Sequence, residues 1–148
     1  MKSKLAVLTL TILLGACAAT APSRNATGAA DSGSPDLACP LSSNCVSSRG
    51  NSPLEPLAYA GTPAQAMAML QATLLTFPEA TVVRSEPLGV EVIFTTSVGF
   101  RDQVDFRIDP QAQRVDFRSR SLVGLFDWGK NRSRMKEFKT RFEQQARR

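Results

Sequence analysis

The chain of 148 residues contains no histidine, and it has only one tryptophan, one tyrosine and three cysteines. Without histidine, the protein lacks the most common general base near neutral pH and the most common transition-metal ligand. A structural zinc site needs four ligands, and the cysteines are too few to provide them. Three cysteines also cannot all pair with one another, so at least one has another role. We therefore expect no metal site and no cofactor.

The N-terminus has the pattern of a secretory signal peptide. Two lysines precede the apolar run 5–14, which at about ten residues is half as long as a membrane-spanning helix. The sequence that follows, Leu-Gly-Ala-Cys at 14–17, resembles the lipobox of bacterial lipoproteins. That resemblance implies cleavage before Cys17, transfer of a diacylglycerol to its thiol and acylation, commonly with palmitate, of the new amino group. The alternative is an ordinary signal peptide with a cysteine near its cleavage site.

The mature protein is expected to stay attached to a membrane of the cell envelope. Ala18 follows the cysteine, and in a bacterium with two membranes this resembles the signal for the outer membrane, on its periplasmic side. Residues 17–36 are small, polar and interrupted by proline and glycine, which predicts a flexible tether without a core. Residues 37–148 are predicted to form a single α+β domain.

Two cysteines of this exported chain are spaced for a disulfide. Five residues, among them proline, serine and asparagine, separate Cys39 from Cys45. Such a segment turns tightly enough to bring two Cβ atoms within bonding distance, and disulfides persist outside the cytosol. The spacing therefore favours a Cys39–Cys45 disulfide over a metal site.

Two helices are predicted. The sequence Thr-Pro-Ala-Gln at 62–65 is a capping box with proline at the first helical position, and we expect this helix to end before Pro78. Its apolar residues recur at spacings of three and four: Met67, Leu70, Leu74 and Phe77. A second helix is expected over 131–145, with an apolar stripe of Met135, Phe138 and Phe142.

Strands are predicted at 81–86, 90–96, 104–108 and 114–118. They form a small four-stranded antiparallel sheet, and both helices are expected to pack on one of its faces. Charge decides the register of the last hairpin, because the favoured register sets opposite charges opposite each other around the loop 110–113. Its pairs are Asp109 with Arg114, Arg107 with Asp116 and Asp105 with Arg118. On this interpretation the charges lie on a solvated sheet face.

The C-terminal quarter of the chain is basic. From residue 114 onward there are eleven lysines or arginines and four acids, whereas 17–113 holds five arginines and nine acids. Four cations surround the expected start of the second helix, where free amides could bind a phosphate, carboxylate or lipid headgroup: Arg120, Lys130, Arg132 and Arg134. Arg118 is a weaker candidate, because the register above pairs it with Asp105. The alternative is that Asp127 or Asn131 caps the helix and the arginines pair with nearby carboxylates.

Three motifs resemble an uncharacterised bacterial family, domain of unknown function family 1499. They lie at 39–48, 100–106 and 118–134, and the last runs Arg-Ser-Arg-Ser-Leu-Val-Gly-Leu-Phe-Asp-Trp-Gly-Lys-Asn-Arg-Ser-Arg. The family pattern there runs Arg-Ser-x-Ser-Arg-x-Gly-x-Ser-Asp-aromatic-Gly-x-Asn-Arg-x-Arg. Leu122 and Phe126 therefore stand where the family usually has arginine and serine. The resemblance implies no established chemistry.

Three functions are compatible with these features. The first is a non-catalytic envelope module whose basic C-terminal region binds an anionic lipid, glycolipid, cell-wall polymer or acidic protein. The second is a hydrolase or transferase with a site in the 118–134 loop, and the third is a purely structural lipoprotein. Paired catalysis by Asp102 and Asp105 is disfavoured because strand alternation points them to opposite faces. Nucleic-acid binding is disfavoured by the compartment and by the lack of interleaved aromatic and basic residues.

Overall fold

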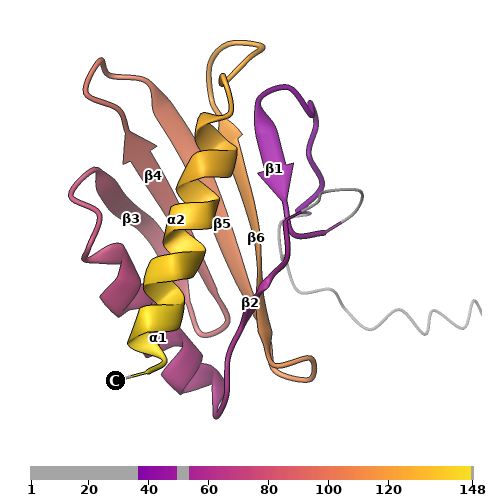
Figure 1. Ribbon diagram of the computed structural model, residues 1–148, viewed down its shortest axis with the longest axis vertical. Coiled ribbons are helices and arrows are strands. Elements are labelled where there is room, and N and C mark those ends of the chain that lie inside the picture. Colours follow the sequence, from indigo (N-terminus) through magenta and orange to yellow (C-terminus); the bar gives the residue numbers. More distant parts are fainter. Residues whose placement is uncertain (1–36, 50–53, 148) are drawn as a thin grey trace, which may run out of the picture. The chain divides into compact units, whose positions relative to one another are not determined.

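The computed structural model describes residues 37–49 and 54–147 (Figure 1). The expected signal peptide, Cys17 and the tether lie outside these residues. No helix in the described ranges is long and apolar enough to cross a membrane.

The described residues form an α+β fold, as predicted, but its sheet has six strands instead of four. The elements in chain order are β1 (Cys45–Ser47), β2 (Leu57–Ala58), α1 (Pro63–Leu74), β3 (Ala80–Glu86), β4 (Gly89–Thr95), β5 (Arg101–Asp109), β6 (Arg114–Ser121) and α2 (Lys130–Gln145). The main path of the sheet is β1-β6-β5-β4-β3, all antiparallel, and β2 also pairs with β6. Figure 1 shows both helices on one face of the sheet.

The two strands that the sequence did not reveal are three and two residues long. Such short segments cannot display an alternating pattern, and they form because the outer edge of β6 offers unpaired backbone groups. Cys45 pairs with Arg120, and Leu57 pairs with Val115.

Helix α1 begins with the predicted capping box. Thr62 Oγ1 accepts a hydrogen bond from the Gln65 amide at 3.2 Å, and Gln65 Oε1 accepts one from the Thr62 amide at 2.8 Å. The helix ends at Leu74, earlier than expected, because the chain tightens into a turn in which the Phe77 amide donates to the Leu74 carbonyl. Phe77 still reaches the core, where it is buried.

The apolar stripe of α2 packs as predicted. Met135, Phe138 and Phe142 are all buried against the sheet. The Phe138 ring lies 4.7 Å from that of Phe106 on β5 and 5.6 Å from that of Phe77, measured between centroids. These contacts join the two helices and the sheet into one core.

The predicted register of the β5–β6 hairpin is confirmed, with Asp105 opposite Arg118 and Asp109 opposite Arg114. Asp109 Oδ1 accepts hydrogen bonds from two backbone amides of the turn, Gln111 and Ala112. The Ala112 bond is the main reason why the pKa of the Asp109 carboxyl lies below its ordinary value.

The expectation that these charges lie on a solvated face is wrong for the middle of the hairpin. Asp105 and Asp116 are 0% and 1% exposed. Arg118 donates to Asp105 at 2.7 Å. The chain after β1 lies along β6 and adds Ser48 and Arg49 as donors to Asp116, at 3.0 and 2.8 Å. Hydrogen-bonded partners of this kind make the burial of a carboxylate possible.

The predicted disulfide between Cys39 and Cys45 is present, with a Cα–Cα distance of 5.6 Å. It closes the turn that leads into β1, and Cys45 is buried. The bridge therefore fixes one end of the segment that packs along β6.

Replacing both cysteines, as Cys39→Ala/Cys45→Ala, should lower the free energy of unfolding. The closed loop is short, so the chain-entropy model gives a loss of about 2–3 kcal/mol at most. Urea denaturation with and without dithiothreitol measures it. The reductant should destabilise the wild type and leave the variant unchanged, whereas equal sensitivity of the two proteins would contradict the prediction.

Candidate functional site

Three connecting segments meet at one end of the sheet (Figure 1). They are the turn between β4 and β5, the loop between β6 and α2, and the residues that precede β1. We call residues 41–44, 96–100 and 122–129 together the loop end. Ser43 donates to the Leu125 carbonyl at 2.5 Å and Asn44 donates to the Gly124 carbonyl at 2.6 Å. The residues before β1 are therefore bonded to the loop between β6 and α2.

The 122–129 loop has an unusual backbone. Gly124 and Gly129 have φ values of 89° and 77°, and Trp128, which is not a glycine, has a φ of 53°. A left-handed conformation at a bulky residue costs on the order of 1–3 kcal/mol and persists only where the surroundings hold it. Here the hydrogen bonds from Ser43 and Asn44 hold one side of the loop and the carboxylate of Asp127 holds the other.

Asp127 closes the N-terminus of α2 from within the chain. Its Oδ1 accepts from the Gly129 amide at 3.0 Å, and its Oδ2 accepts from the Asn131 amide at 2.8 Å. These two amides are therefore not free for an outside anion, because the protein's own carboxylate already binds them.

The sequence analysis considered Asn131 as a cap of the helix, but its side chain bonds other elements of the fold. Its side chain is completely buried. Oδ1 accepts from Ser119 Oγ at 2.6 Å, and Nδ2 donates to the Asn44 carbonyl at 3.0 Å and to Ser121 Oγ at 3.2 Å. One amide side chain thus fastens α2 to β6 and to the segment before β1.

Arg134 is not available to an outside anion, contrary to expectation. Its side chain is 5% exposed and pairs with Asp102 at 2.5 Å, while its guanidinium lies 4.9 Å from the centre of the Phe94 ring. It also donates to Asn131 Oδ1 at 2.9 Å. Asp102, from the helix side of β5, is equally buried. The pair is an internal link between α2 and the sheet.

Arg118 and Arg120 lie on the other face of the sheet. Strand alternation turns Phe117 and Ser119 toward α2 and these two arginines away from it. Arg118 pairs with Asp105 at 2.7 Å. Arg120 donates to Gln103 Oε1 at 2.9 Å, and its Nε atom is buried with no hydrogen-bond partner in the described part of the chain. The five candidate cations therefore do not converge, and only Lys130 and Arg132 share the exposed first turn of α2.

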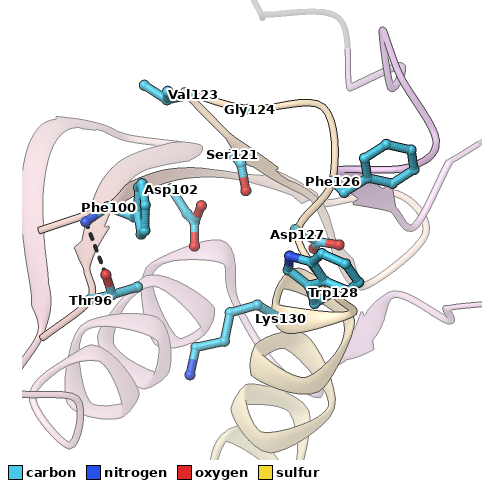
Figure 2. A pocket seen from close by; sticks show the side chains of 10 residues that line it. All are labelled: Thr96, Phe100, Asp102, Ser121, Val123, Gly124, Phe126, Asp127, Trp128 and Lys130. Carbon is cyan, nitrogen blue, oxygen red and sulfur yellow. Dashed lines mark hydrogen bonds between the residues drawn. The ribbon is translucent and has the colours of Figure 1, made fainter. Parts of the chain in front are cut away.

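A hollow of about 240 Å³ opens between the 96–100 turn and the loop before α2 (Figure 2). In Figure 2, Phe100 and Asp102 approach it from one side and Asp127 and Trp128 from the other, and the Lys130 amine points away from Ser121. Its lining consists of Thr96, Phe100, Asp102, Ser121, Val123, Gly124, Phe126, Asp127, Trp128 and Lys130.

Four of the five polar side chains of the hollow already have partners. Asp102 pairs with Arg134, and Asp127 bonds the backbone amides of α2. Thr96 Oγ1 accepts from the Phe100 amide at 3.0 Å, and Ser121 Oγ accepts from Asn131. The arrangement provides a recess with one exposed cation, Lys130, in which the hydroxyl oxygens of Thr96 and Ser121 accept hydrogen bonds from amide groups of the protein.

The surface around the hollow is apolar, a property that the sequence analysis missed. Leu122 and Phe126 entered it only as departures from a family pattern. The available signal was the apolar run 122–126 inside a loop, where polar residues are usual. The exposed large apolar side chains of the loop end are Leu41, Val98, Phe100, Leu122, Val123, Leu125, Phe126 and Trp128.

Comparison with known proteins identifies the family. The model of a family described as a protein of unknown function, DUF1499, matches residues 37–142. The chain belongs to this family. The resemblance inferred from the three motifs is thereby confirmed. The chain matches none of the curated proteins with which it was compared.

Breaking the buried pair in the DUF1499 domain should be costly. Arg134→Met leaves the Asp102 carboxylate buried without its partner, and we expect a loss of about 3–5 kcal/mol in the free energy of unfolding. The double variant Asp102→Leu/Arg134→Met should recover most of that loss, because no uncompensated charge remains. Urea denaturation measures both.

Arg132→Gln is the matched control, since Arg132 lies in the same helical turn but is half-exposed. Its effect should stay within about 0.5 kcal/mol, as for most surface substitutions. Equal destabilisation by Arg134→Met and Arg132→Gln would show that the buried pair has no special role.

Proposed function

We propose that this DUF1499 protein is a lipid-anchored, non-catalytic module of the bacterial cell envelope that binds an anionic envelope component at its loop end. The binding proposal rests on one observation, the difference in exposure between the apolar and the polar side chains at the loop end. The large apolar side chains and Lys130 are exposed and Arg132 is partly exposed, whereas four of the five polar side chains in the hollow bond within the chain. Exposed surfaces of this composition mark interaction sites.

The anchoring part of the proposal rests on the sequence. The signal-like residues 1–16 and the lipobox-like 14–17 support a lipid on Cys17, and Ala18 supports the periplasmic face of the outer membrane where two membranes exist. As a flexible chain, residues 17–36 would have a root-mean-square reach of about 25 Å. A domain on such a tether samples the membrane surface and anything bound there.

The cations at the border of the loop end are Arg101, Lys130 and Arg132. Arg101 is exposed at the start of β5, and its carbonyl accepts from the Leu122 amide at 3.0 Å, which places it beside the apolar loop. Three acids lie near them, of which Asp102 is paired with the buried Arg134 and leaves two to set against the three cations. Asp127 is engaged with backbone amides, and Glu79 lines a second small recess together with Lys130. The cations outnumber the acids, which favours an anionic partner.

Lipidation is tested with Cys17→Ser. The variant lacks the thiol that receives diacylglycerol, so we expect an unprocessed precursor, whereas the wild type should have lost residues 1–16 and gained the mass of its acyl chains. Intact-protein mass spectrometry of membrane fractions makes the comparison. Cys39→Ser/Cys45→Ser should be processed and lipidated like the wild type. Normal processing of Cys17→Ser would contradict the proposal.

Anion binding is tested by the salt concentration that elutes the detergent-solubilised full chain from phosphocellulose. Lys130→Gln/Arg132→Gln should elute at clearly lower salt than the wild type, because screened contacts with exposed charges determine retention. Lys136→Gln/Arg147→Gln is the control, since it removes the same charge from the middle of α2 and from the residues that follow the helix. Equal shifts in the two variants would show that net charge alone, and no localised site, governs retention.

A further inference from the structure

We propose that the partner of the loop end is the surface of an anionic phospholipid bilayer, into which Trp128, Phe126 and Leu125 insert. This inference rests on the proposed function and gives the chemistry of its partner. It concerns the same residues, and it makes the domain a second, reversible membrane contact in addition to the lipid on Cys17.

The exposed apolar side chains are gathered at one end of the domain. The loop end holds eight of the twelve large apolar side chains that are exposed among the described residues. Leu75, Val82 and Val83 lie instead about α1 and β3, and Leu88 lies in the turn between β3 and β4. A soluble domain seldom exposes a contiguous apolar patch without an interaction that covers it.

The type and place of these side chains fit the interfacial region of a bilayer. Trp128 is 96% exposed, and tryptophan favours the boundary between headgroups and acyl chains because its ring is apolar with one polar N–H. The residues come from three separate segments, and the hollow that four of them line is small. A lipid bilayer can deform around several inserted side chains, whereas a protein partner would need a matching cavity for each of them.

Cations border the apolar tips. Lys130 lies two residues after Trp128 and Arg132 one position from the buried Asn131, both in the first turn of α2. Arg101 lies beside Leu122. Lipid phosphates lie just outside the layer in which Trp128 would rest, so the cations are placed to meet them while the apolar tips are inserted.

The loop is ordered before it meets lipid. Ser43 and Asn44 bond its carbonyls, Asp127 bonds the amides that follow Trp128, and the tryptophan is held at a positive φ. Insertion therefore orders little additional chain. As a flexible tether, residues 17–36 would also hold the domain close to the membrane, so weak docking suffices at the resulting effective concentration.

The experiment uses Trp128 as its own probe, because it is the only tryptophan of the chain. The full-length, lipid-bearing protein is reconstituted into vesicles of phosphatidylcholine with and without 30 mol% phosphatidylglycerol. Each composition is also prepared with acyl chains brominated near the headgroup. In phosphatidylglycerol vesicles we expect blue-shifted emission, at least twofold quenching by the brominated chains and protection from acrylamide.

Two double variants separate the loop end from exposed apolar surface in general. Leu125→Ser/Phe126→Ser should lose most of the bromine quenching. Leu75→Ser/Val82→Ser, which removes two exposed apolar side chains near α1 and β3, should keep it. All four side chains are exposed, and circular dichroism verifies that each variant is folded.

The outcomes distinguish this inference from the proposed function. In one outcome the mass of the protein shows the lipid, but the Trp128 emission remains red-shifted, is quenched by acrylamide and is not quenched by the brominated chains. This result overturns docking, leaves anchoring intact and points to a protein partner. If the purified protein carries no lipid, anchoring has failed, and this protein is added to preformed vesicles instead. Quenching of Trp128 by the brominated chains then still supports docking. Equal quenching with and without phosphatidylglycerol overturns the role of the cations.

Discussion

The buried hydrogen bonds that join the start of α2 to β5 and β6 determine the geometry of the residues around the candidate site. Arg134 pairs with Asp102 of β5, and Asn131 bonds Ser119 of β6 and the carbonyl of Asn44. Buried groups of this kind are costly when partly satisfied and specify one arrangement when fully satisfied. Because they fix the start of α2 against two strands and the segment before β1, they also fix both ends of the 122–129 loop.

That constraint explains how a strained loop presents apolar side chains to solvent. A loop with free ends would relax Trp128 out of the left-handed region and fold its apolar residues back onto the domain. Here both ends are bonded, and Asp127, Ser43 and Asn44 satisfy its backbone polar groups.

Much of the fold followed from the sequence, because local signals determine it. The capping box of α1, the apolar stripe of α2 and the charge pairing of the last hairpin each involve residues close together in the chain. The short strands β1 and β2 and the Asp102–Arg134 pair did not follow, since their partners are distant in the sequence. For the same reason the five basic residues were grouped as one site, although strand alternation and burial separate Arg118, Arg120 and Arg134 from the other two.

The family motif at 118–134 acquires a physical meaning from these contacts. Most residues that match its pattern are used inside the domain: Arg118, Ser119, Ser121, Asp127, Asn131 and Arg134 bond neighbouring groups, and Gly124 and Gly129 have positive φ values. Two matching positions have no side-chain bond to another described residue, namely Trp128, which lines the hollow, and Arg132, which lies in the first turn of α2. Leu122 and Phe126, the two departures from the pattern, replace polar groups with exposed apolar ones at the same place. The motif in this chain therefore supplies the bonded support of the loop, and Trp128 and Arg132 lie on that support beside exposed apolar side chains.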